Sequence, residues 1–244
     1  MIGTRSLDAL VVGAVLLAVW EALFAWAGAV AITPPLATMR YAISLLGSGF
    51  FWSNVAATME AFAAALVIAA VGGVALGIAL GLRRFAGDVA EPILASLYTI
   101  PKVTLYPVML LVFGLGISAK VAFGVIHGVV PITLTTLAAV KAIPPVYVRA
   151  ARAMRLTSWQ TAVRVLAPAA LPEIVGGLRI GFSVTLLGVL IGEMFASQRG
   201  LGFLILNGIG SHNVPMTTAV TLLVIVFAVA ANAALLMLDR RVGG

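Results

Sequence analysis

The chain has 244 residues, of which 62% are hydrophobic and only 9% are charged, against about 25% charged in an average soluble domain. Its 15 basic and 8 acidic side chains are too few to cover a soluble core of this length, so the composition predicts a membrane protein and excludes most soluble enzymes. The absence of cysteine excludes disulfides, thiolate metal sites and cysteine nucleophiles.

Six apolar stretches between charged residues are long enough to cross a bilayer. A hydrocarbon core about 30 Å thick needs roughly 20 residues of helix. The sequence therefore predicts an all-α, polytopic membrane bundle of about six transmembrane helices. The stretches cover residues 7–32, 61–82, 103–119, 121–140, 174–198 and 216–238.

The first stretch has two interpretations. Arg5 precedes the apolar run, and Ala25-Trp26-Ala27 or Ala29-Val30-Ala31 resembles a signal-peptide cleavage site. The apolar core of a signal peptide is usually about 7 to 15 residues long, and this stretch is longer. We therefore expect a retained transmembrane helix.

Basic residues gather on one side of the predicted membrane. Only Arg40, Lys120 and Arg199 fall on the other side, and Lys102 lies ambiguously at a span end. The positive-inside rule therefore predicts that both termini and residues 141–172 are cytoplasmic. Because topology explains the net charge of +7, we expect no nucleic-acid partner. The residues on the cytoplasmic side are Arg5, Arg83, Arg84, Lys141, Arg149, Arg152, Arg155, Arg164, Arg179, Arg240 and Arg241.

Glycines recur at four-residue spacing in several predicted spans, which allows close contact between helices. Contacts within one chain and contacts across a dimer fit this pattern equally well. Examples are Gly73-Gly77-Gly81, Gly124-Gly128 and Gly177-Gly181.

Residues 141–172 are far less apolar than their neighbours. Pro144 and Pro145 end the fourth span, and residues 147–159 have helical composition. Thr157-Ser158 can interrupt or recap this helix, and Pro168 and Pro172 act as breakers. A basic helix on anionic lipid and a solvated loop are the simpler interpretations. At 100° per residue one arc holds Arg149, Arg152 and Arg155, and the opposite side holds Tyr147, Ala150, Ala151 and Met154.

The order of residues in this segment resembles the cytoplasmic EAA loop of ABC importer permeases. The matching residues are Arg149-Ala150-Ala151, Arg152-Ala153-Met154, Leu156-Thr157-Ser158-Trp159-Gln160 and Val165-Leu166-Ala167-Pro168. Flanking motifs resemble the subgroup that imports nitrate, sulfonates, taurine, bicarbonate or thiamine-type precursors, and the resemblance covers about residues 55–240. These motifs are Ile100-Pro101-Lys102 with Pro107, Phe113-Gly114-Leu115-Gly116, Ala169-Ala170-Leu171-Pro172-Glu173-Ile174, Gly177-Leu178-Arg179, Gly192-Glu193-Met194 and Gly200-Leu201-Gly202.

The sequence departs from the family pattern at three positions. Arg149 replaces the family's glutamate, Arg155 its glycine, and Ala167 the leucine before the first proline. Arginine resists backbone conformations that glycine permits, so we expect the turn at residue 155 to be built differently. Replacing an acid with a base also reverses one electrostatic contact with the ATPase.

The resemblance implies a type I ABC importer permease fold in a bacterial inner membrane. Residues 1–52 would form an N-terminal helix and an extracytoplasmic connection, and residues 53–240 the permease core with its coupling loop, 141–172. Cytoplasmic ATP-binding subunits would grip this loop. The other implied partners are a periplasmic or lipid-anchored solute-binding protein and a second permease copy, as a homodimer. The implied coupling surface comprises Arg149, Ala150, Ala151, Arg152, Leu156, Trp159, Gln160 and Pro168.

ATP hydrolysis is expected from the partner alone. The chain has no GxxxxGK[ST] motif, because residues 114–120 lack a glycine beside Lys120. It also lacks HExxH and a nucleophile elbow, so we predict no enzyme activity and no cofactor. A secondary transporter or channel without an ATPase is the alternative, but it would leave the basic loop without a role.

Three residues within the spans are candidates for a gate or pathway. Glu193 resembles the acid that the family places before its Gly-Leu-Gly loop, and we predict a gate or structural network there. Pro101 and Pro107 are expected to break the third span near its cytoplasmic end, which marks a pathway or an ordinary kink. His127 is expected to be a packing residue, so no metal site is predicted. The spans contain no arginine cluster that requires an anionic substrate.

The outer loop has one further expected feature. Residues 200–210 are predicted to form a short outer re-entrant helix that faces the binding protein.

Overall fold

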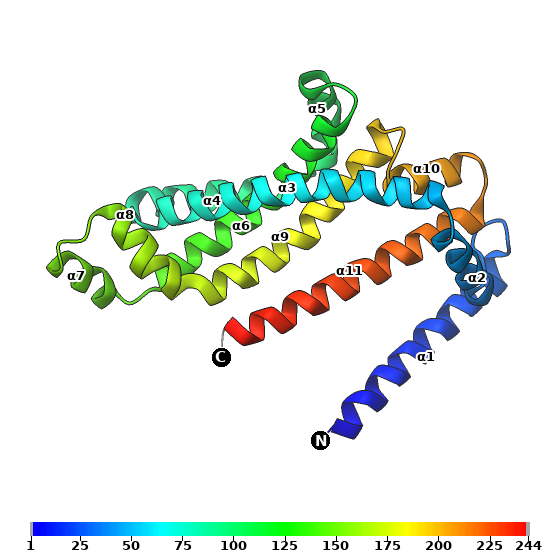
Figure 1. Cartoon of the computed structure of the whole chain (residues 1–244), viewed down its shortest axis with the longest axis horizontal. Coiled ribbons are helices and arrows are strands. Elements are labelled where there is room, and N and C mark those ends of the chain that lie inside the picture. The colour runs from blue at the N-terminus through cyan, green and yellow to red at the C-terminus, as the bar shows by residue number, and fades with distance from the viewer. Residues whose placement is uncertain (1, 243–244) are drawn as a thin grey trace.

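The computed structural model describes residues 2–242, and all regular secondary structure within that range is helical (Figure 1). In chain order the elements are α1 (Ile2–Ala27), α2 (Pro35–Leu46), α3 (Gly49–Gly81), α4 (Arg84–Thr99), the 3-10 turn η1 (Lys102–Leu105), α5 (Tyr106–Phe113), α6 (Ile117–Ala142), α7 (Pro145–Ala153), α8 (Ser158–Thr161), the π-helical segment η2 (Ala162–Leu166), α9 (Ala167–Ala196), α10 (Leu201–Gly210) and α11 (Val214–Val242).

Within the described range, five helices are long and apolar enough to cross a membrane. A sixth crossing forms if α4 and the following segment Lys102–Phe113, bent by 84° relative to each other, are counted as one span. The predicted all-α bundle of about six transmembrane helices is confirmed. The five helices are Leu10–Ala27, Gly49–Gly81, Ile117–Ala142, Ser158–Phe195 and Val214–Met237.

The third span differs from the predicted residues 103–119. With the bent pair counted as one span, it starts at Arg84. Counting apolar intervals between charged residues leaves α4 out, because α4 carries charged residues in its first turns. Pro101 lies in the break that follows the 16 residues of α4, and therefore well away from the expected cytoplasmic end. Pro107 lies in the first turn of α5, where a proline breaks no helical hydrogen bond.

Helices α3, α6 and α9 pack against one another to form the centre of the bundle (Figure 1). Glycines permit this close approach. A Cβ atom on Gly77 of α3 would lie 2.5 Å from Cβ of Thr136 in α6, and one on Gly73 would lie 2.8 Å from Cβ of Ile132. The four-residue glycine repeats of α3 therefore serve contacts within this chain.

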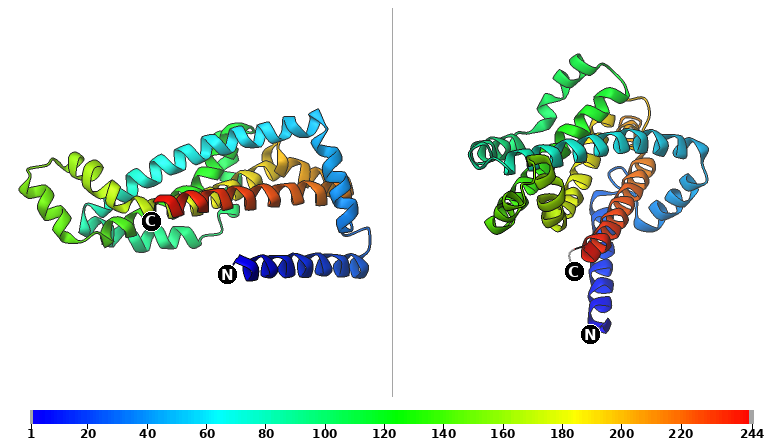
Figure 2. Two further views of the ribbon diagram at one scale, coloured as in Figure 1. Left: turned by 60° about the horizontal axis from the view of Figure 1, so that its bottom comes forward. Right: turned by 60° about the vertical axis from the view of Figure 1, so that its left-hand side comes forward.

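The bundle has two distinct ends. Helices α7 and α8 lie at one end, called here the α7 end, and α2 and α10 lie at the other, called here the α10 end (Figure 1). Along the chain α1 runs toward the α10 end and α11 runs away from it, so the start of α1 and the end of α11 both lie on the side of their helices that is distant from the α10 end (Figure 2). Both helices are mostly exposed, since none of the span of α1 and only 6% of that of α11 is buried, and α11 joins the core near its start, where Val220 packs with Leu204.

The helix that carries α9 starts earlier than the predicted residue 174. Ser158–Phe195 is one candidate span of 38 residues, in which α8, η2 and α9 follow one another without a break. The prediction that Pro168 and Pro172 act as breakers is therefore wrong. Pro168 lies in the first turn of α9, directly after the π-helical segment, whose altered hydrogen-bond spacing accommodates the missing N–H, while Pro172 lies inside α9.

Candidate functional site

The loop between α6 and α9 contains two short helices, and the helix expected over residues 147–159 is interrupted between Ala153 and Ser158. α7 has Pro145 in its first turn and ends at Ala153. α8 begins after Thr157, whose Oγ1 accepts a hydrogen bond from the backbone N–H of Gln160 at 3.2 Å. The Gln160 Oε1 atom accepts one from the N–H of Thr157 at 2.9 Å. This capping box confirms that a helix is recapped at Thr157.

The turn after α7 places Arg155 in a backbone conformation that favours glycine. The N–H of Leu156 donates to the carbonyl of Ala151 at 3.0 Å, and the N–H of Arg155 donates to that of Arg152 at 2.9 Å. These two bonds form a Schellman motif, in which the residue after the cap is left-handed and usually glycine. Arg155 has φ +55°. Contrary to expectation, the arginine adopts the left-handed turn, and it lies outside the helical arc predicted with Arg149 and Arg152.

Replacing Arg155 with glycine is expected to stabilise the folded protein by about 1 kcal/mol, because a left-handed L-residue costs roughly 1–2 kcal/mol. Arg152→Gly, three residues earlier in helical backbone, should instead destabilise it by about 1 kcal/mol. Thermal unfolding of the two purified variants checks the prediction. Equal destabilisation by both would show that the left-handed turn carries no strain.

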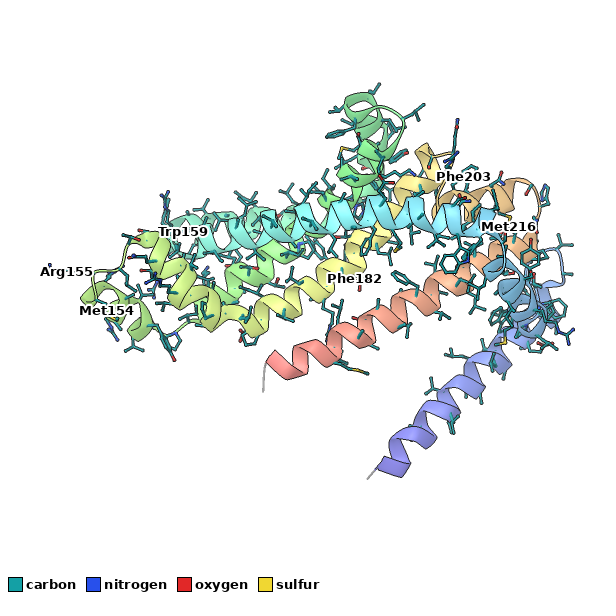
Figure 3. The ribbon with its side chains drawn as sticks, in the orientation of Figure 1. Met154, Arg155, Trp159, Phe182, Phe203 and Met216 are labelled. Atoms are coloured by element: carbon teal, nitrogen blue, oxygen red, sulfur yellow. The ribbon has the colours of Figure 1, made fainter. Side chains whose placement is uncertain are left out.

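The predicted coupling residues form an exposed projection at the α7 end. Trp159 is 76% exposed, and Met154 is 72% exposed at the tip beside Arg155 (Figure 3). Within α7, Arg149, Ala150 and Arg152 are exposed, whereas Ala151 is only 2% exposed. Leu156 and Gln160 are half-buried, and Pro168 is exposed one helical segment further on. Large apolar side chains in a polar segment are typical of a surface that binds another protein.

A groove of about 630 Å³ separates α7 from the adjoining ends of α3, α4 and α6. Arg84, Lys141, Arg149 and Arg152 line it together with Asp88. The predicted Arg149 and Arg152 therefore lie close to bases from two other helices, in a strongly cationic surface.

An ion-pair cluster that sequence analysis missed joins α4 to the end of α6. Lys141 Nζ lies 2.6 Å from Asp88 Oδ1 and 2.8 Å from Glu91 Oε2. Asp88 and Glu91 are three residues apart and so lie on one face of α4. This spacing is the one sequence signal that points to the cluster. α7 starts three residues after α6 ends. The two ion pairs of Lys141 therefore connect α4 of the bent span to the segment that leads into α7.

At the α10 end, Glu193 is completely buried and holds several helices together. Its carboxylate accepts hydrogen bonds from Thr58 Oγ1 at 2.8 and 3.0 Å and from the N–H of Gly202 at 3.0 Å. Lys120 Nζ lies 3.7 Å from Glu193 Oε1. The carboxylate therefore joins α9 to α3, α6 and the first turn of α10.

The same cluster fixes the turn that leads into α10. Its three further bonds run from Gly200 N–H to Asn54 Oδ1, from Leu201 N–H to Thr58 Oγ1, and from Lys120 Nζ to the carbonyl of Arg199, each 2.8 Å long. We name Asn54, Thr58, Lys120, Glu193, Gly200, Leu201 and Gly202 the α10 latch.

Two glycines of the Gly200-Leu201-Gly202 motif are required by this geometry. Gly200 has φ +125°, and a Cβ atom there would overlap the Glu193 carboxylate. A Cβ atom on Gly202 would overlap the carbonyl oxygen of Leu190. A short helix is present over the predicted residues as α10, and the N–H of Gly202 in its first turn donates to a carboxylate, as a helix N-terminus favours.

The break after α4 brings Lys102 into the protein. Pro101 precedes it, and the pair of helices is bent there by 84°. The sequence did not assign Lys102 to either side of the membrane. In the structure its side chain is only 9% exposed, so it lies inside the protein.

His127 packs within α6, as expected for a structural histidine. Its Nδ1 lies 2.8 Å from the carbonyl oxygen of Phe123, and its ring lies 4.6 Å from that of Phe123. Among the described residues, no group of three or more His, Asp or Glu side chains could hold a metal ion.

Comparison with known proteins agrees with this geometry. Residues 73–244 match the family model "Binding-protein-dependent transport system inner membrane component". The taurine transport system permease protein TauC of Escherichia coli K12 is 32% identical over 199 residues, which are 79% of this chain and 72% of the relative. The nitrate import permease protein NrtB of Leptolyngbya laminosa is 30% identical over 85% of this chain and 77% of its own.

Two more matches extend the range of relatives. The formylaminopyrimidine transport permease protein ThiX of Halalkalibacterium halodurans is 31% identical over 77% of this chain and 75% of its own. A chain of the inward-facing MetNI methionine ABC transporter superposes with a TM-score of 0.62 at 23% identity, and the match covers 81% of this chain and 96% of that one. The structural match shows the shared fold, and the sequence matches show the family. The chain belongs to the binding-protein-dependent inner-membrane permeases of ABC importers.

Proposed function

We propose that this chain is the membrane-spanning permease subunit of an ATP-driven, binding-protein-dependent importer for a small solute. The observation that carries the proposal is the α7–α8 projection between two spans, with a buried Ala151 and an exposed Trp159. This arrangement offers a short helix to the groove of a cytoplasmic ATPase, a mode of recognition also seen in soluble proteins.

The long helix Ser158–Phe195 provides the mechanical connection. At 1.5 Å per residue the 30 residues of α9 alone extend about 45 Å, and α8 and η2 join α9 to the projection at Trp159. A displacement of the projection by closing ATPases would therefore tilt a rigid element that reaches the opposite end of the bundle. Alternation between two packings of such elements gives inward-open and outward-open states.

The partners follow from the two ends of the molecule. The ATPases bind the α7 end through Arg149, Ala150, Ala151, Arg152, Leu156, Trp159, Gln160 and Pro168, and ATP hydrolysis belongs to them. The solute-binding protein, periplasmic or lipid-anchored, docks at the α10 end, and a second copy of this chain completes a homodimer in a bacterial inner membrane. The basic residues near α7 support a cytoplasmic position for both termini, as does the placement of the free ends of α1 and α11 away from the α10 end (Figure 2).

The substrate is a nitrate-, sulfonate- or taurine-like anion or a thiamine-precursor-like compound. The names of the relatives support this range, since they include taurine, nitrate and formylaminopyrimidine permeases.

Uptake into proteoliposomes tests the proposal. The complex with its ATPase and binding protein should accumulate a labelled probe from a panel of nitrate, taurine, bicarbonate and formylaminopyrimidine only when ATP is present on the ATPase side. Replacing the P-loop lysine of the ATPase should abolish this uptake. Uptake that continues without the ATPase, driven by an ion gradient, would instead establish a secondary transporter.

A further inference from the structure

Lys102 lies where a membrane helix is broken. The backbone of Ile100 and Pro101 is extended, with ψ of +132° and +91°, between the end of α4 and the start of η1. Non-helical backbone at membrane depth is tolerated where it is buried in protein or lines a water-filled cavity. In transporters, broken helices of this kind form substrate and ion sites.

Neighbouring contacts place Lys102 inside the bundle. Tyr106, one turn later, packs edge-on against Phe123 with ring centroids 5.3 Å apart and donates a hydrogen bond to the carbonyl of Gly192 at 3.2 Å. Phe123 lies six residues, about 9 Å, from the first residue of α6 and nineteen residues, about 28 Å, from its last. The turn that holds Lys102 therefore leads into a helix that packs against the interior of α6.

The ammonium group has few partners in the protein. Nζ donates one hydrogen bond, to the carbonyl of Tyr98 at 3.2 Å, and lies 4.8 Å from the centroid of the Tyr98 ring. Within the described residues, no carboxylate oxygen lies within 4.0 Å of it. Lys120 and Lys141, by contrast, each pair with a carboxylate. An ammonium has three donors, so two remain available to a ligand.

We propose that Lys102 is the cationic contact for an anionic substrate as it crosses the membrane. A buried cation in a membrane span usually pairs with another charge or marks a substrate pathway, and here the described part of the chain supplies no anionic partner. A carboxylate, sulfonate or nitrate oxygen fits the two open donors. This inference rests on the proposed function and narrows the substrate class of the importer to small solutes with an anionic group. A single buried lysine supplies the cationic contact, so the spans need no arginine cluster.

The first experiment removes or keeps the charge at residue 102 in the complete reconstituted complex. Lys102→Met should lower ATP-driven uptake of the anion that the wild type carries, among nitrate, taurine and bicarbonate, by roughly tenfold or more. Lys102→Arg should keep at least about a third of it. Arg164→Met, at an exposed base of η2 that is not among the coupling residues, is the matched control and should leave uptake unchanged.

The second experiment restores the charge chemically and does not depend on the Met variant folding well. Because the chain has no cysteine, Lys102→Cys introduces the only one in the permease. Aminoethyl methanethiosulfonate rebuilds a side chain that ends in an ammonium, and methyl methanethiosulfonate adds a neutral group. Uptake after the first reagent should exceed uptake after the second by roughly fivefold or more.

The outcomes separate this inference from the proposed function. If Lys102→Met transports like the wild type, or if the neutral and cationic modifications give equal uptake, Lys102 is not the anion contact and the importer remains. If the wild type carries formylaminopyrimidine but none of nitrate, bicarbonate and the sulfonate taurine, or carries no probe at all, the assignment of Lys102 to an anionic group is also overturned. Anion uptake that persists without the ATPase would overturn the proposed function instead, whatever the result at Lys102.

Discussion

Replacing Ala151 with aspartate is expected to uncouple ATP hydrolysis from transport. Ala151 is 2% exposed, and its carbonyl accepts the hydrogen bond that closes the turn at Leu156. A carboxylate there would be buried without a partner, at a cost of several kcal/mol, and would force α7 away from η2. Each 1.4 kcal/mol is a factor of ten, so uptake should fall by at least about tenfold.

The measurement is the ratio of solute taken up to ATP hydrolysed in proteoliposomes. Ala153→Asp places the same side chain at an exposed position of the same helix and is the control. Its carboxylate near the helix C-terminus costs only about 0.3–1 kcal/mol, so transport should largely remain. Normal assembly and transport by Ala151→Asp would refute the assignment of α7 as the coupling element.

Sequence patterns located the spans that contain a long apolar run and missed α4, in which charged residues recur through the first half of the helix. Clean apolar runs correctly located the centres of α3, α6, α9 and α11. α4 was left out because Asp88 and Glu91 lie within it. In the structure both carboxylates are paired with Lys141, which lies about 50 residues away in the sequence, so one-dimensional counting treats them as the end of a span.

The α10 latch shows a similar limit. Glu193 stood out because an acid in an apolar span is costly. Its partner Thr58 is 135 residues away in sequence, and no local pattern distinguishes that threonine from others in α3. Likewise, the family's glycine at position 155 indicated an unusual backbone, but only the structure shows that Arg155 adopts it. The residue type at a position thus indicated that the position is structurally unusual. The residues that contact it could not be read from the sequence, because they are set by the tertiary structure.

Replacing Glu193 with alanine is expected to destabilise the protein by about 3 kcal/mol or more. The change removes the counter-charge of Lys120 and the acceptor for Thr58 and for the N–H of Gly202, and breaking a buried pair in this way typically costs 3–5 kcal/mol. Glu193→Gln keeps an acceptor oxygen and should cost less. Unfolding of the purified permease, followed by helical circular dichroism against denaturant, measures both.

A double-mutant cycle separates the charge from the hydrogen bonds. Lys120→Met alone leaves Glu193 as a buried anion, so it should be destabilising, and combining it with Glu193→Gln should recover about 1–2 kcal/mol relative to the sum of the single changes. If the two effects simply add, the 3.7 Å contact contributes no pair energy. Glu193 would then act through Thr58 and the first turn of α10 alone. In that case Thr58→Val, which keeps the shape and removes the hydroxyl, should approach Glu193→Ala in its effect, because both remove the hydrogen bond between α3 and α9.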